Sequence, residues 1–404
     1  MRILYILSGT EIRGGATKSF LAMADSVVAA GHQVAVVVPD ENGVTPVLKS
    51  KGWEVLVVPY MFATLPYLSW ALRDMVKFVP RLVKSKTLNR KARKIVDEFA
   101  EKWRPDIVHD NTSVTDLGYY VGQKLNIPHL IHIREYGWRD FHRINPGLKR
   151  RLSDPNAYVA TITADLASFR GKGIKNSHLR VIYNGVVSGI PSGYNPAKAP
   201  YFLYAGRIRE AKGVGDLIAA YVAYASTEIG AGRVPLGLKL AGALDTGEFM
   251  DKVRGQIKDA GIDDYVEWLG ERDDVGSFYS VAAATVIPSR AEGFGRVMPE
   301  AMAAGSLCIA RNEGGLAEQL DNGRRECGKD IAFGYETVDE LTAILTQISD
   351  AYREGGCYNE GGRFFRMIAD SRDVTCRLYS YEANARGILN YYSEIHNADR
   401  TDRK

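Results

Sequence analysis

Short runs rich in Val, Ile and Leu alternate with longer stretches of helical periodicity from the first residues of the chain. Residues 3–7 are predicted to form a buried strand, residues 17–30 a helix and residues 33–38 the next strand, which together make one βαβ unit. The alternation continues with a long helical region ending at Trp103 and with predicted strands at residues 53–58, 106–109, 128–133, 157–162 and 180–183. Strands of this composition with helices between them predict a parallel sheet covered on both faces.

Residues 185–200 break this pattern. Their glycines and prolines have the composition of a linker: Gly185, Gly189, Pro191, Gly193, Pro196 and Pro200. The alternation then restarts, with only helices expected after the last of the predicted strands at residues 201–205, 236–240, 265–268, 284–288 and 307–310.

These patterns predict an α/β protein with two Rossmann-like domains that face a central cleft, the usual place for a ligand. The first domain is expected at residues 1–184 and the second at residues 201–380, with the linker at 185–200 between them. The final segment, residues 381–404, is predicted to hold a helix that packs back across the hinge toward the first domain.

The composition fits a well-packed globular protein, with 46% hydrophobic and 25% charged residues among the 404. The four cysteines lie far apart without C-x-x-C spacing, which argues against a zinc site and a disulfide framework. The N-terminal apolar run is shorter than that of a signal peptide, and no stretch reaches the ~20 apolar residues of a transmembrane helix. We therefore expect a cytoplasmic protein.

Residues 70–104 form a basic segment, with eleven Lys and Arg against four Asp and Glu, in a chain of formal net charge +4. Two sets of positions recur at helical spacing, one basic and one apolar: Arg73, Lys77, Arg81 and Lys84, and Leu72, Val76, Val79 and Val83. Such a helix can lie on an anionic membrane. The alternative is a solvated helix face that covers the core, which Pro80 favours by interrupting the pattern. No nucleic-acid partner is expected, because interleaved aromatic residues are missing.

Two carboxylates, Glu292 and Glu300, lie on either side of a Gly-Phe-Gly turn and the start of an Ala-rich helix. The predicted strand at 284–288 places Glu292 in the loop at its carboxyl end, where open α/β sheets bind ligands. Pro299 suits the first turn of the following helix. Each carboxylate can take a pair of hydroxyls, as ribose and hexose offer. The alternative is an ordinary strand, loop and helix that happen to carry two Glu.

A second cluster, residues 205–213, lies between the first strand of the second domain and its helix. Gly206 lets the chain turn, while Arg207 and Lys212 can reach phosphate oxygens beside a helix N-terminus. The cluster therefore suits a diphosphate, and the alternative is a surface turn with ordinary basic residues.

A third cluster follows the first predicted strand. Gly14 and Gly15 stand at the start of a helix, where they can present amides to a phosphate or a sugar. The G-x-G-x-x-G fingerprint is absent, so the main evidence for an interpretation as an NAD-dependent enzyme is missing.

Taken together, several motifs, in order from end to end, resemble the retaining family 4 glycosyltransferases of GT-B fold. They are Gly14-Gly15, Gly31 to Val34 (GHQV), Val181 to Val186 (VIYNGV), Gly206-Arg207 with Lys212-Gly213, Pro288 to Gly295 (PSRAEGFG), Glu300 to Gly305 (EAMAAG) and Gly314 to Glu318 (GGLAE). The chain departs from the family pattern at Ser306 to Ile309, where a proline and valines are usual, and in the segment from Asp321 to Cys327. These departures concern base recognition.

The resemblance implies roles for individual positions. Arg207 and Lys212 would hold the donor diphosphate, which removes the need for a metal ion, and no cofactor is implied. Glu300 would bind the ribose hydroxyls, and Glu292 would face the donor sugar without acting as a nucleophile. The remaining donor-binding positions would be Gly14, Gly15, Gly206, Gly293, Phe294, Gly295 and Arg296.

The family often has a polar residue, commonly His, at a strand end near the anomeric carbon of the donor. His132 and Arg134 occupy that place here, and strand alternation puts them on the same side. The choice between them stays open, and His132 can equally be a strand histidine bonded to a neighbour. His109 is a weaker candidate, and the other histidines are interpreted as surface or turn residues.

The sequence thus predicts a cytoplasmic retaining hexosyltransferase that uses a nucleoside diphosphate sugar, and a peripheral position at the inner face of the membrane stays open. A UDP-sugar is preferred to a GDP-sugar, with a glycan or lipid-linked acceptor in cell-surface polysaccharide or glycolipid synthesis. The alternatives are a glycosyltransferase of a small-molecule acceptor and a non-catalytic nucleotide-sugar-binding protein.

Overall fold

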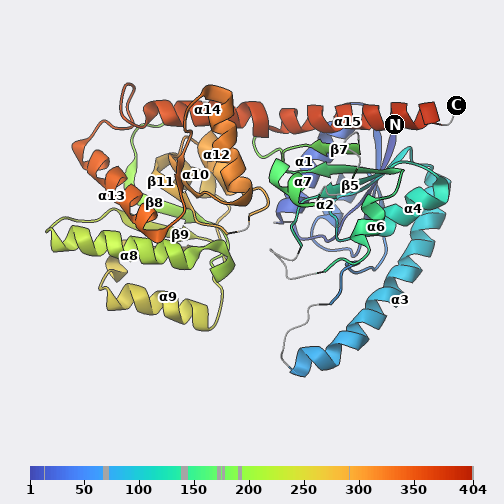
Figure 1. Cartoon of the computed structure of the whole chain (residues 1–404), viewed down its shortest axis with the longest axis horizontal. Helices are drawn as coiled ribbons and strands as arrows, with labels where there is room; N and C mark the ends of the chain where they lie inside the picture. The colour runs from blue at the N-terminus through green and yellow to red at the C-terminus, as the bar shows by residue number, and fades with distance from the viewer. Residues whose placement is uncertain are drawn as a thin grey trace. The chain divides into compact units, whose positions relative to one another are not determined.

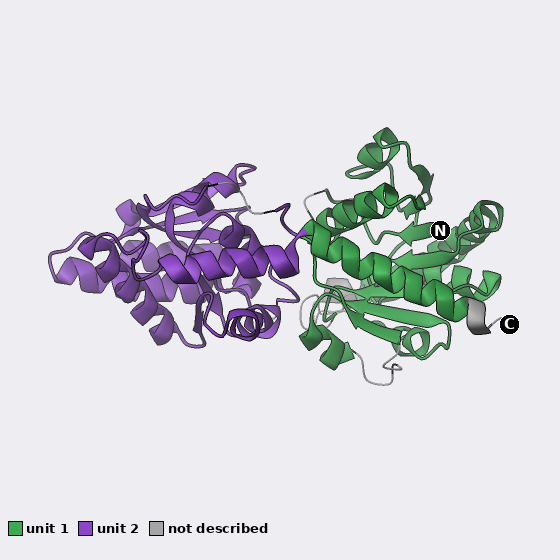
Figure 2. Ribbon diagram, turned by 90° about the horizontal axis from the view of Figure 1, so that it is seen from above, with its two compact units in different colours: residues 1–185, 381–404 green, residues 186–380 purple. Residues whose placement is uncertain are grey.

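The structure is a computed structural model that describes residues 1–12, 14–66, 72–137, 144–170, 174, 178–189, 193–290 and 292–402, and only the backbone of 72–75 and 400–402. Its contacts divide the chain into two compact units (Figure 2). Unit 1 holds residues 1–185 and 381–404, and unit 2 holds residues 186–380. Of the positions singled out in the sequence, Pro191 and Ala291 lie outside the described residues.

Unit 1 is built on a seven-stranded parallel sheet in the order β3-β2-β1-β4-β5-β6-β7 (Figure 1). The strands are β1 (Arg2–Ile6), β2 (Gln33–Val38), β3 (Glu54–Val57), β4 (Ile107–Asp110), β5 (His129–Ile133), β6 (Ala157–Thr161) and β7 (Leu179–Val181). The helices are α1 (Gly15–Ala29), α2 (Thr45–Ser50), α3 (Leu72–Trp103), α4 (Leu117–Leu125), α6 (Leu148–Leu152), α7 (Ala164–Arg170) and α15 (Tyr381–Asp402).

Both faces of this sheet are buried. Successive residues of β1 point to opposite faces, so Ile3 and Tyr5 pack with side chains of α1 and α15, whereas Leu4 and Ile6 pack with those of α3 and α4. The last helix of the chain therefore returns to the first sheet and lies against α1, as predicted.

Unit 2 repeats the architecture with six parallel strands in the order β10-β9-β8-β11-β12-β13. The strands are β8 (Ala199–Ala205), β9 (Gly237–Ala241), β10 (Val266–Gly270), β11 (Ala282–Ile287), β12 (Cys308–Arg311) and β13 (Phe333–Tyr335). The α-helices are α8 (Val214–Gly230), α9 (Glu248–Asp259), α10 (Val275–Val281), α11 (Val297–Ala303), α12 (Gly314–Cys327), α13 (Val338–Glu354) and α14 (Phe365–Tyr379). Short 3-10 turns span Glu210–Lys212 and Asp263–Tyr265.

The two parallel Rossmann-like sheets confirm the predicted fold class. The expectation that only helices follow β12 is wrong, because β13 pairs with β12 at the edge of the sheet. Its Phe-Gly-Tyr sequence is three residues long and has no β-branched side chain, so it gives no strand signal.

Residues 72–103 of the basic segment form one continuous helix, α3, in which Pro80 lies without ending it. The interpretation that α3 covers the core holds for its second half, where Ala92, Val96 and Ala100 are buried. In the first half Val76, Val79 and Val83 are 67%, 63% and 57% exposed. Leu72 and Arg73 belong to the part whose side chains are not described.

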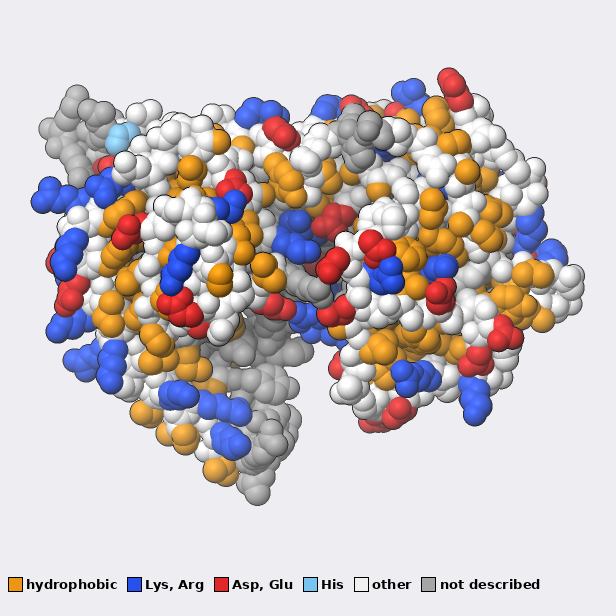
Figure 3. Space-filling view, turned by 180° about the vertical axis from the view of Figure 1, so that it is seen from behind, with side chains coloured by type: hydrophobic (Ala, Val, Ile, Leu, Met, Phe, Trp, Pro, Cys, Tyr) orange, Lys and Arg blue, Asp and Glu red, His pale blue; other side chains and the backbone are white. Residues whose placement is uncertain are grey.

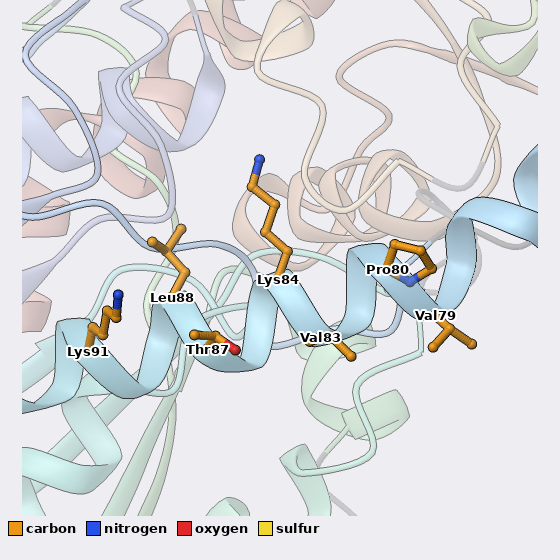
Figure 4. Close-up of a pocket in the computed structure, with 7 residues that line it drawn as sticks. All are labelled: Val79, Pro80, Val83, Lys84, Thr87, Leu88 and Lys91. Carbon is orange, nitrogen blue, oxygen red and sulfur yellow. The ribbon is translucent and has the colours of Figure 1, made fainter.

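In Figure 1 the first half of α3 projects beyond the sheet of unit 1, and Figure 3 shows Lys and Arg side chains beside hydrophobic ones along it. A shallow hollow of about 570 Å³ lies along this stretch (Figure 4). None of the helices within the described ranges combines the length and the apolar content needed to cross a bilayer.

Candidate functional site

In unit 2, two loops meet at the carboxyl edge of the sheet, where β8 and β11 are neighbours. The loop after β8 carries Arg207 and Lys212, and the loop after β11 carries Glu292. The ammonium of Lys212 lies 2.5 Å from a carboxylate oxygen of Glu292, and both side chains are about a quarter exposed, at 29% and 23%. Residues 80 positions apart thus form one ion pair open to solvent.

Glycine at position 213 makes this meeting of loops possible. Gly213 has φ +69° at the start of α8, and a Cβ there would lie 1.9 Å from the carbonyl oxygen of Pro288. The turn after β8 therefore packs directly onto the end of β11. Gly242, which the sequence reading did not single out, allows a similar approach, since its Cβ would lie 1.8 Å from the carbonyl oxygen of Gly206.

The Gly-Phe-Gly turn is anchored by its neighbours. The Phe294 ring is 3% exposed and packs edge-on against Tyr379, with ring centroids 5.4 Å apart. The side-chain amide of Gln319 donates to the carbonyl oxygen of Phe294, and the amide of Gly315 donates to that of Glu292 at 2.8 Å. Phe294 is thus a buried anchor that holds the turn between β11 and α11 in place.

Glu300 lies in the first turn of α11, as predicted, with Pro299 one position before it. Its side chain is 32% exposed, and one carboxylate oxygen lies 3.4 Å from the guanidinium of Arg296. Glu292 and Glu300 are therefore carried by the two ends of one short segment that follows β11.

Asp216, in the first turn of α8, is a residue that the sequence reading missed. It accepts hydrogen bonds from Arg290, at 2.7 Å, and from Arg311. It thereby joins α8 to the residues at the ends of β11 and β12. The sequence shows Asp216 only as an acidic residue near the start of a predicted helix. Such a residue predicts where a helix begins and does not predict contacts with Arg290 and Arg311.

In unit 1, the glycine loop and the end of β4 lie together. Gly14 caps α1, and Gly15 is its first residue. The Asn111 side chain donates to the carbonyl oxygen of Ala16 at 3.3 Å, which ties the start of α1 to the loop after β4.

His132 and Arg134 lie side by side at the end of β5, as strand alternation predicts. A guanidinium nitrogen of Arg134 lies 3.2 Å from His132 Nδ1. The same guanidinium donates to the Asn111 carbonyl oxygen at 2.9 Å and to the Asn184 side-chain oxygen at 2.5 Å. His132 has no exposed surface, whereas Arg134 is partly exposed.

A second buried histidine stacks on the first. The rings of His109 and His132 are 5.5 Å apart at an angle of 18°, and His109 Nδ1 lies 2.6 Å from the hydroxyl of Tyr392 in α15. Burial, reinforced by the charge of Arg134, lowers the pKa of both histidines well below the ordinary 6.5. Both are therefore neutral at pH 7.

The interpretation of the remaining histidines as surface or turn residues is wrong for His129. It is 2% exposed at the start of β5, and its Nε2 lies 2.8 Å from a carboxylate oxygen of Asp110. Because this sheet is covered on both faces, even the first position of the strand is buried. Among the described residues, no group of three or more His, Cys, Asp and Glu side chains is arranged to hold a metal ion.

The buried histidines give an expected pH dependence of stability. Their native pKa values lie below the unfolded value of 6.5, so below that pH the unfolded chain binds protons that the native chain does not. The free energy of unfolding should therefore fall below pH 6.5, by about 1.4 kcal/mol per pH unit for each histidine. Urea unfolding at pH values from about 7.5 to about 5 measures the free energy of unfolding over this range.

The control is the double variant His109→Asn/His132→Asn, which keeps every carboxylate of the native chain. Its free energy of unfolding should fall less steeply over the same pH range. Equal slopes in the two proteins would mean that the histidines do not cause the acid sensitivity.

Residues 14–185 match the model of the glycosyl transferase 4-like domain, and residues 191–349 match that of the glycosyl transferases group 1. A glycogen synthase of Mycobacterium tuberculosis is 26% identical over 332 residues, which covers 77% of each chain. The lipopolysaccharide core biosynthesis mannosyltransferase LpsB of Rhizobium meliloti is 25% identical over 50% of this chain and 54% of its own.

Among solved structures, that of Anabaena HepE in complex with UDP superimposes with a TM-score of 0.72. It covers 97% of this chain and 100% of its own at 18% identity. The same protein is also solved with UDP-glucose, with a TM-score of 0.67.

Proposed function

Because the chain belongs to the glycosyl transferase group 1 family, which is family 4 of the retaining hexosyltransferases with the GT-B fold, we propose that it moves a hexose from a UDP-sugar to a glycan or lipid-linked acceptor. The observation that carries this proposal is the meeting of Lys212, from the loop that also carries Arg207, with Glu292 at the carboxyl ends of adjacent strands. A cation suited to a diphosphate and a carboxylate suited to sugar hydroxyls lie in one place. The UDP bound by HepE supports uridine as the base.

In the proposed reaction, Arg207 and Lys212 hold the diphosphate and neutralise the charge that grows on it as the glycosidic bond breaks. The two positive charges in this loop neutralise the diphosphate without a metal ion. Glu300 binds the ribose hydroxyls. Glu292 and the backbone of residues 293–296, together with Gly206, surround the sugar and its phosphates in unit 2. The amides of Gly14 and Gly15 at the start of α1 are proposed as further donor-binding groups. The acceptor attacks from the side of the leaving group, which retains the anomeric configuration.

The acceptor is proposed to be a glycan or a lipid-linked sugar of cell-surface polysaccharide or glycolipid synthesis. The relatives named for lipopolysaccharide core and glycogen synthesis support this class. The protein is proposed to act in the cytoplasm.

A thermal-shift series tests the donor class. UDP is expected to bind only the folded chain. At 100 times Kd it should raise the free energy of unfolding by about 2.7 kcal/mol, and Tm should rise accordingly. NAD should leave Tm unchanged. Stabilisation by NAD without any by UDP or GDP would overturn the proposal.

The first half of α3 is proposed to rest on an anionic membrane at the inner face. Val76, Val79 and Val83 present apolar side chains to solvent, and Lys77, Lys84 and Lys91 are exposed on the same helix. An apolar strip flanked by lysines is the combination that partitions into the headgroup region of anionic lipids. The lipid-linked acceptor would be met at that surface.

Sedimentation with vesicles tests this contact. Vesicles of phosphatidylcholine mixed with phosphatidylglycerol should recover the protein, and Val79→Ser/Val83→Ser should release most of it. Lys84→Glu should weaken binding by roughly 1 kcal/mol or more, about fivefold. Val234→Ser is the matched control, since Val234 is 74% exposed in unit 2. Equal recovery with vesicles of phosphatidylcholine alone at low salt would contradict the proposed contact of α3 with anionic lipids.

A further inference from the structure

A hollow of about 530 Å³ lies between α8 and α9 of unit 2, two helices that are side by side (Figure 1). We call it the α8–α9 groove. Its lining comes from both helices, from Glu210 in the turn before α8 and from Arg290 after β11. The volume is within the ~300–1,000 Å³ of ordinary small-ligand sites. No residue assigned to the donor lines the groove, so it is distinct from the candidate site described above.

The charged side chains of the groove divide into paired and unpaired groups. Arg290 donates to both carboxylate oxygens of Asp216, at 2.8 and 2.7 Å, so these two side chains are closed on each other. Glu210, Glu248 and Lys252 are exposed, and their side chains have no partner among the residues that the structure describes. Two carboxylates and one ammonium are therefore left for a ligand. This set disfavours a phosphate or another anion, because the negative charges outnumber the positive one.

An aromatic ring forms an apolar part of the same lining. Phe249 of α9 is half-buried and packs against the core of unit 2. Gly215, the second residue of α8, lies opposite this ring. A Cβ on Gly215 would lie 3.8 Å from Cε2 of Phe249, with no other side chain of the described residues within 4 Å. The missing side chain at position 215 therefore leaves space beside the ring.

The groove thus combines an aromatic ring with separate acceptor and donor groups. A neutral sugar fits this combination, because its hydroxyls can donate to the carboxylates of Glu210 and Glu248 and accept from the ammonium of Lys252. The apolar C–H face of a pyranose can pack on the ring of Phe249. Ligand sites commonly have this make-up of an apolar wall and a few polar groups that fix orientation.

We propose that the α8–α9 groove is a second glycan-binding site, which holds neutral sugar units of the acceptor or product chain away from the place of transfer. The inference rests on the proposed transfer of a hexose to a glycan. A chain held at this site stays at high local concentration near the enzyme, as in other bivalent contacts. The groove then affects the binding of long glycans and leaves the binding of UDP unchanged.

The test is affinity electrophoresis in native gels that contain glycogen or mannan, two neutral polysaccharides. At least one of them should retard the wild type relative to a gel without polysaccharide. Glu248→Ala and Lys252→Ala should each raise the apparent Kd for that polysaccharide by about 10-fold or more, since each removes a hydrogen bond to a charged group. The Tm shift with UDP should stay at the wild-type value.

A blocking variant tests the groove without removing any of its binding groups. Gly215→Gln places a side chain in the space beside Phe249, and Gln is a better helix former than Gly, so the fold should be kept. This variant should lose retardation about as strongly as Glu248→Ala.

Asp251→Ala and Arg254→Ala are the matched controls. Asp251 is in the first turn of α9 together with Glu248, and Arg254 is a basic residue of the same helix as Lys252. Both are exposed, and neither lines the groove. Both controls should be retarded as strongly as the wild type.

Two results would overturn the inference. One is a wild type that UDP stabilises but that neither polysaccharide retards, and the other is retardation of the three groove variants as strong as that of the controls. Retardation through the groove in a protein that neither binds UDP nor turns over any UDP-sugar would instead overturn the proposed function. The two failures are therefore distinguishable.

Discussion

Lys212→Met is expected to lower kcat/KM for the donor by about 10²- to 10³-fold, the usual effect of removing one preorganised group that stabilises developing charge. In the proposed reaction the diphosphate gains negative charge as it leaves, and Lys212 is one of two cations assigned to it. Steady-state kinetics with a UDP-sugar measures the loss. Isothermal calorimetry with UDP should show a weaker but measurable affinity, because Arg207 remains.

The matched control for this variant is Lys239→Met. Lys239 pairs with Glu267 at 2.7 Å and is 28% exposed, close to the 29% of Lys212. An ordinary surface ion pair contributes only ~0–1 kcal/mol, so Lys239→Met should keep wild-type kinetics. If the two variants behave alike, Lys212 has no part in the reaction.

The ion pair between Lys212 and Glu292 also predicts that a substitution of Glu292 has the opposite effect on the affinity for UDP. Glu292→Gln removes the carboxylate that lies 2.5 Å from Lys212 and leaves that cation free for a diphosphate. UDP should therefore bind about 3- to 10-fold tighter, whereas turnover of the UDP-sugar should fall. UDP affinity that drops together with turnover would show that Glu292 contributes to nucleotide binding directly.

Glu300→Gln is expected to weaken UDP binding by about 30- to 100-fold. A carboxylate that accepts two ribose hydroxyls makes charge-assisted hydrogen bonds, each about 1.5–3 kcal/mol. A comparison of UDP with 2′-deoxy-UDP isolates this contact. The wild type should bind the deoxy nucleotide more weakly than UDP, and Glu300→Gln should hardly distinguish the two.

Glu326→Gln is the control for this substitution. Glu326 pairs with Arg377 in unit 2 and is 33% exposed, against 32% for Glu300. It should leave both nucleotides bound as in the wild type. A Glu300→Gln protein that still distinguishes UDP from its 2′-deoxy form would remove Glu300 from the ribose site.

The sequence predicts the fold well because the signals are local and repeated. Strand-length apolar runs and the helices between them are enough to place both sheets, and strand-end logic places Glu292 in a loop and Glu300 in a helix. The strand β13 and the burial of His129 escape prediction. The first is too short to carry a pattern, and the second depends on which helices cover the sheet.

The contacts within the candidate site could not be predicted, since they depend on strand order. Lys212 meets Glu292 only because β8 and β11 are neighbours, which no local pattern states. The tie between Asn184 and Arg134 joins residues 50 positions apart in the same way. The exposure of Val79 and Val83 likewise follows from how far α3 extends past the sheet, not from its amphipathic pattern.

The most direct test of the central claim is a panel of UDP- and GDP-sugars, added without metal and with a chelator present, in which nucleotide release and thermal stabilisation are followed together. We expect one UDP-sugar to stand out in both readouts and the chelator to have no effect. A well-folded protein that neither releases nor is stabilised by any nucleotide in the panel would contradict it.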